Sequence, residues 1–127
     1  MKVAWDRVWN LTLWALQGFL ALLFLYFGAD KLNQHVGFWM GLFGKIGIGQ
    51  WFRYFVGGLE VICAILLLIP RTSAIAAVLL AFTMAGAVVT HLLILHDSYY
   101  AAFFPAFPLL LLVVVAWKRS SAPVERN

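Results

Sequence analysis

Four long apolar stretches dominate the chain, and short polar segments separate them. A helix that crosses a bilayer needs roughly 20 mostly apolar residues, which fits stretches at about residues 8–29, 51–69, 74–95 and 99–117. Residues 70–73 and 96–98 form connections so short that the helices they join must be antiparallel neighbours. The pattern therefore predicts an all-α membrane protein, a four-transmembrane-helix bundle that forms a single membrane domain over residues 1–127.

The longer segment between the first two stretches, residues 28–50, is too apolar to lie in water. Its glycines weaken helix propensity, so we expect one short amphipathic helix around residues 32–43, followed by an irregular re-entry. This interfacial segment should lie on the outer leaflet. Its apolar side chains are Val36, Phe38, Trp39, Met40, Leu42, Phe43, Ile46 and Ile48.

Composition and charge agree with a membrane location. The 127 residues are 65% hydrophobic and only 11% charged, which lies far outside the range of soluble domains. If the N-terminus is cytoplasmic, the inner side carries Lys2, Arg7, Arg71, Lys118, Arg119 and Arg126, and the outer side only Lys31, Lys45 and Arg53. The positive-inside rule then places both termini in the cytoplasm. The net charge of +4 points to lipid headgroups and not to nucleic acid.

Thiol and metal chemistry find little support in the sequence. Cys63 is the only cysteine, so one chain can build neither a disulfide nor a CxxC centre nor a thiolate metal cage. We expect Cys63 to be a small packing residue, and we predict no metal site and no covalent cofactor. Gln17, in the first stretch, should form a hydrogen bond between helices.

Glu60 lies near the middle of the second stretch, where an acidic side chain costs about 3 kcal/mol to insert. Acids at that depth usually face a bundle interior and mark a ligand or ion pathway, although a helix-to-helix staple is the alternative. Because Cα–Cβ bonds tilt toward a helix N-terminus, Lys31 and His91 should lean toward Glu60 from the first and third helices. Arg53 leans outward and should extend to lipid headgroups. For Lys31 the alternative is an ordinary lysine at the membrane interface. For His91 it is an imidazole packed inside the bundle.

Several pieces of the chain resemble one known family. They are FLYFGADKL at residues 24–32, the glycine-rich stretch ending in GIGQW, GGLEVICAILLLIPR at 57–71, and AIAAVLLAFTMAGAVVTH at 74–91. This chain is similar to the DoxX family of small bacterial membrane proteins. The resemblance implies four helices in the cytoplasmic membrane, with Lys31, Glu60 and His91 at polar positions. Family members are linked to quinone-dependent oxidation of reduced sulfur compounds, to oxidative stress and, in a eukaryotic relative, to receptor assembly.

These features predict a non-catalytic accessory or binding module with a polar pocket in the outer leaflet. The ligand would be a quinone or a lipid. The partners would be the lipid bilayer, a membrane oxidoreductase or other membrane protein, or a second copy of the chain, in respiratory or sulfur redox metabolism. The predicted ligand-binding residues are Glu60, Lys31, His91, Arg53, Tyr54 and Trp39.

Two alternatives belong to other functional classes. A small proton-coupled transporter also has four helices and one membrane carboxylate, but such proteins carry the acid in their first helix, where this chain has Gln17. An enzyme acting on a lipophilic substrate could use Glu60 and His91 as an acid and base pair. Nothing in the sequence names a substrate, and we expect no catalysis by the isolated chain.

Overall fold

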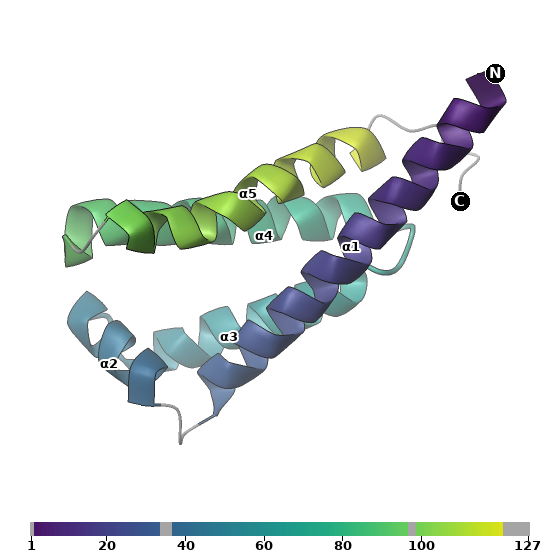
Figure 1. Cartoon of the computed structure of the whole chain (residues 1–127). Helices are drawn as coiled ribbons and strands as arrows, with labels where there is room; N and C mark the ends of the chain where they lie inside the picture. The colour runs from purple at the N-terminus through teal and green to yellow at the C-terminus, as the bar shows by residue number, and fades with distance from the viewer. Residues whose placement is uncertain (1, 34–36, 97–98, 121–127) are drawn as a thin grey trace.

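The computed structural model describes residues 2–33, 37–96 and 99–120. Every regular element within these ranges is helical, as predicted (Figure 1). In chain order the elements are α1 (Lys2–Leu32), α2 (Gly37–Ile46), α3 (Gln50–Leu66), α4 (Ser73–Val89), the π-helix η1 (Thr90–Leu95) and α5 (Tyr99–Ser120).

The long helices form two antiparallel pairs. Helix α1 packs along α3, and α4 packs along α5. Figure 1 shows the pairs close together near the α3–α4 turn and diverging toward the other end. There the short helix α2 contacts α1, α3 and η1. The two pairs thus form a V that closes near the α3–α4 turn, and α2 lies at its open end.

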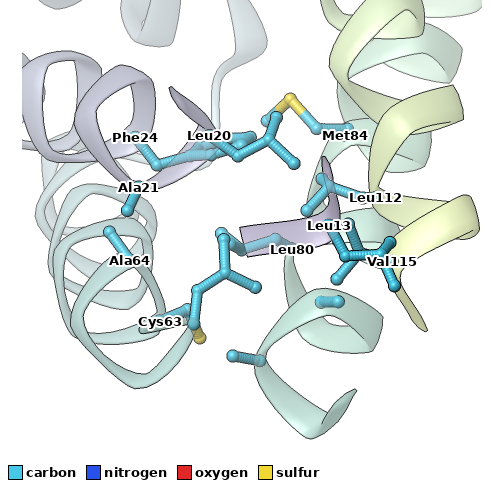
Figure 2. Close-up of a cluster of buried hydrophobic side chains, with 13 residues drawn as sticks. Leu13, Leu20, Ala21, Phe24, Cys63, Ala64, Leu80, Met84, Leu112 and Val115 are labelled. Atoms are coloured by element: carbon cyan, nitrogen blue, oxygen red, sulfur yellow. The ribbon is translucent and has the colours of Figure 1, made fainter. Parts of the chain in front are cut away.

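A buried apolar cluster joins the two pairs (Figure 2). Its members come from α1, α3, α4 and α5, and many are small, which lets helix backbones approach closely. Cys63 is 1% exposed within this cluster, so its predicted packing role is confirmed. The cluster comprises Leu13, Leu20, Ala21, Phe24, Cys63, Ala64, Leu67, Ala76, Ala77, Leu80, Met84, Leu112 and Val115.

Three helices within the described ranges are long and apolar enough to cross a membrane, which makes this chain a membrane protein. They are Val3–Leu32, Ser73–Leu95 and Tyr99–Ser120. Helix α3 has 17 residues and ends at Leu66 rather than at residue 69. Pro70 has no N–H that could continue the helix onto the Leu66 carbonyl. The Thr72 hydroxyl donates a hydrogen bond to that carbonyl instead, at 2.8 Å, in the turn into α4.

The other boundaries differ from the prediction in ways that hydropathy does not reveal. Helix α1 begins at Lys2, α5 continues to Ser120, and α2 spans Gly37–Ile46 instead of residues 32–43. Residues 34–36, which fall in the predicted interfacial helix, lie outside the described residues. The third apolar stretch changes from α-helix to π-helix at Thr90 and ends where His96 adopts a left-handed conformation with φ of 50°.

Candidate functional site

Helices α1 and α3 cross at a pair of glycines. A Cβ atom on Gly57 would lie 2.9 Å from the Gly28 carbonyl oxygen and 3.0 Å from the Lys31 Cβ. A Cβ atom on Gly28 would lie 2.9 Å from the Gly57 carbonyl oxygen and 3.1 Å from the Glu60 Cβ. Only residues without side chains allow the two backbones to come this close.

This crossing brings Lys31 and Glu60 together. Each follows its glycine by one helical turn, and each side chain leans back toward the crossing because Cα–Cβ bonds tilt toward the helix N-terminus. Lys31 Nζ lies 2.8 Å from Glu60 Oε1. The side chains are 8% and 1% exposed. The convergence that the sequence predicts for these two residues is therefore observed.

The Glu60 carboxylate has unused hydrogen-bonding capacity. The Lys31 ammonium, a charged donor, occupies Oε1 at 2.8 Å, whereas no described residue donates a hydrogen bond to Oε2. Buried carboxylate oxygens normally have hydrogen-bond donors around them. Glu60 Oε2 is thus a buried acceptor that the described residues leave without a donor.

Aromatic rings surround the lysine end of the pair. Lys31 Nζ lies 4.0 Å from the centroid of the Trp39 ring, which α2 supplies, and 6.0 Å from that of Phe27. Phe27 in turn makes edge contacts with Trp39 and with Phe104 of α5, at centroid distances of 6.2 and 5.7 Å. The cation therefore contacts the negative face of an indole ring, which stabilises it away from water.

Arg53 corrects one prediction. It does not reach lipid headgroups, because its side chain is buried with 1% exposure. Its guanidinium donates hydrogen bonds to the backbone carbonyls of Lys31 and Asn33, and to the Gln50 side chain at 2.8 Å. Carbonyls in the last turn of a helix lack partners within the helix, so Arg53 caps α1. Tyr54 stacks on this guanidinium at 4.4 Å and is partly exposed.

His91 lies in η1 and is half-buried. It makes no hydrogen bond to either oxygen of Glu60. The sequence predicts its direction from α-helical geometry, and residues 90–95 form a π-helix, which makes i→i+5 hydrogen bonds. The role predicted for His91 stays a prediction. The structure brings Lys31, Glu60 and Trp39 together and adds Arg53 with Tyr54 at the end of α1.

A second buried polar cluster lies where the helix pairs meet. Gln17 donates to the Leu67 carbonyl at 2.8 Å and accepts from Arg119 Nε at 2.6 Å. Arg119 also donates to Asn10 at 2.9 Å and lies 4.8 Å from the Trp14 ring. The predicted interhelical role of Gln17 is confirmed. The charge count places Arg119 on the cytoplasmic side, and the sequence offers one signal of a buried partner, the polar Gln17 in the facing helix.

A shallow apolar furrow lies between α4 and α5. Its volume is about 460 Å³. Apart from Ser120, the side chains that line it carry no hydrogen-bonding group except the Trp117 indole N–H, so it offers little to a polar ligand. The lining residues are Val78, Ala81, Phe82, Ala85, Leu109, Val113, Ala116, Trp117 and Ser120.

The sequence profile of the DoxX-like family matches residues 15–116, most of the chain. The chain belongs to the DoxX-like family. The region matched in this DoxX-like protein contains the glycine crossing, the ion pair, Arg53 and Gln17, but it ends before Arg119. No match was found among curated proteins or among solved structures. The comparison thus supports a family of membrane proteins without naming a ligand, a partner or a reaction.

Proposed function

We propose that this chain is a non-catalytic module that binds a lipophilic ligand at the Lys31–Glu60 pair. The observation that carries the proposal is the Glu60 carboxylate, which is 1% exposed and whose Oε2 accepts no hydrogen bond from the described residues. If Lys31 and Glu60 served only to hold α1 and α3 together, the ion pair alone would be enough. The free acceptor next to aromatic rings is the arrangement of a small-molecule site, where a few polar groups orient a ligand within apolar walls.

The proposed membrane arrangement has four spans, with α3 as the fourth. At 1.5 Å per residue its 17 residues extend about 25 Å, and about 17 residues is the lower limit for a spanning helix. With both termini in the cytoplasm, six basic residues lie inside and three outside. This arrangement puts the ion pair in the outer half of a bacterial cytoplasmic membrane, with α2 on the outer surface.

A quinone or a membrane lipid fits this site best, because each joins a long apolar tail to a polar head. The tail would lie among the apolar side chains near the open end of the V, and the head would reach Glu60. An accessory role beside a membrane oxidoreductase follows from a chain that binds such a molecule but has one cysteine and no cofactor motif. That partner and a second copy of the chain are both part of the proposal.

The test is to identify what the protein retains on purification. Wild type and the double variant Lys31→Met/Glu60→Leu are purified in nanodiscs, extracted, and compared by mass spectrometry of lipids and quinones. The double variant removes the ion pair without leaving a buried charge alone. Gly58→Ala is the matched control on the same helix, because a Cβ there meets no atom within 4 Å.

Wild type and Gly58→Ala should retain one lipophilic compound above its share in the bulk lipid. The double variant should lose it while keeping its helical circular dichroism. Equal composition of the extracts from all three proteins contradicts ligand binding at this pair.

A further inference from the structure

The chemical groups around the ion pair restrict what kind of ligand head can bind. This inference rests on the proposed function and concerns the same site. Lys31 holds Glu60 Oε1 at 2.8 Å, and Glu60 Oε2 accepts no hydrogen bond from the described residues. An ionised carboxylate only accepts hydrogen bonds, so a head that carries only carbonyl oxygens finds no donor at Glu60.

The neighbouring cations are already engaged by groups of the protein. The Lys31 ammonium contacts Glu60 Oε1 at 2.8 Å, and Trp39 lies over it at 4.0 Å. Arg53 directs its guanidinium to the carbonyls of α1 and to Gln50. The group left without a partner is the acceptor Glu60 Oε2, so a ligand that donates a hydrogen bond satisfies it and a ligand that only accepts does not.

Trp39 indicates the shape of the head. It is a planar ring against a buried ammonium, and a ligand ring can make the same cation–π contact. Trp39 belongs to a short helix in which Phe43 alone is buried. That helix is followed by Gly47 and Gly49, with φ of 85° and 122°, a conformation that lets the backbone turn sharply. Trp39 itself is half-buried, and its partners on α1 are Lys31 and Phe27.

We propose that the ligand carries a hydroxyl group on an aromatic ring, that this hydroxyl donates to Glu60, and that the ring replaces Trp39 against the Lys31 ammonium. In this arrangement the phenol or quinol form of a lipophilic molecule binds, and its ether or quinone form binds weakly. Trp39 occupies the ring position until the ligand displaces it.

The test uses two probes, para-dodecylphenol and its methyl ether. They differ in whether the ring oxygen carries a hydrogen, which can be donated, or a methyl group, which cannot. Binding of each radiolabelled probe to the full chain in phosphatidylcholine nanodiscs is measured at equilibrium, and partition into empty nanodiscs is subtracted. A hydrogen bond to a charged group contributes about 1.5–3 kcal/mol, so wild type should bind the phenol about tenfold or more tighter than the ether. Gly58→Ala should keep this preference, and Lys31→Met/Glu60→Leu should lose it.

A second variant tests the position of the ring. Trp39→Ala should bind the phenol more tightly than wild type, because the ligand no longer competes with the indole. If Trp39→Ala binds the phenol more weakly than wild type, the displacement of Trp39 is overturned, and Trp39 instead contacts the bound ligand.

The remaining outcomes separate the two proposals. Equal affinity for phenol and ether, with both lost in the double variant, overturns the hydroxyl requirement and leaves the proposed binding function standing. If neither probe binds specifically, the hydroxyl requirement is overturned as well. The proposed binding function is then decided by the mass spectrometry of the purified protein's extracts.

Discussion

Two neighbouring glycines in α3 should respond in opposite ways to the same substitution. Alanine at Gly57 would place a Cβ 2.9 Å from the Gly28 carbonyl oxygen, a backbone atom that cannot rotate away. Helices α1 and α3 must then separate, and overpacking of this kind costs about 1–3 kcal/mol. Alanine at Gly58 meets no atom within 4 Å. Both changes gain the same helix propensity, about 1 kcal/mol, so the difference between the variants isolates the packing term.

The assay is reversible unfolding in mixed micelles, with sodium dodecyl sulfate as denaturant and far-ultraviolet circular dichroism as the signal. Gly58→Ala should be more stable than wild type, and Gly57→Ala should be less stable than Gly58→Ala by about 1–3 kcal/mol. If the two variants unfold at the same detergent fraction, the close crossing of α1 and α3 is refuted.

Three further predictions concern the buried charges. Lys31→Met should lower the unfolding free energy by about 3–5 kcal/mol, and adding Glu60→Leu should restore most of it; equal losses in single and double variants would contradict this. Gln17→Leu leaves Arg119 without one acceptor and should cost about 1–3 kcal/mol in the same titration; a change within about 0.5 kcal/mol, as at surface sites, would count against it. Arg53→Met should speed hydrogen exchange in the last turn of α1, measured by mass spectrometry, and unchanged protection would show that the cap is dispensable.

The ion pair could be predicted from the sequence because its geometry depends on properties of single helices. The direction of each helix follows from the alternation of spans, and the tilt of Cα–Cβ bonds then decides which way a side chain leans. Lys31 and Glu60 are long enough to meet once their helices are neighbours. What the sequence did not supply was the reason those helices touch, which is the close approach of Gly28 and Gly57.

The differences from the prediction occur where partners come from another helix or where helix type changes. Arg53 is expected at lipid headgroups and Arg119 is counted on the cytoplasmic side, yet each is buried against polar atoms of α1. Hydropathy averages do not reveal these contacts, because Arg53 bonds to backbone carbonyls, which have no sequence signature, and Arg119 bonds to Gln17, a single polar residue in an apolar stretch. Nothing in the sequence of residues 90–95 marks a π-helix, so the change of helix type there could not be predicted.

The capping of α1 by Arg53 also concerns how the protein is made. Helix α3 carries Arg53 and Glu60, and a charged residue at a helix centre costs about 2.5–3.5 kcal/mol to insert. Both of their partners, the end of α1 and the Lys31 ammonium, leave the ribosome earlier than α3 does. If α3 inserts as the fourth span that we propose, both partners are therefore present before it enters the membrane. A circular permutant that begins at α3 would insert this helix before either partner has been made.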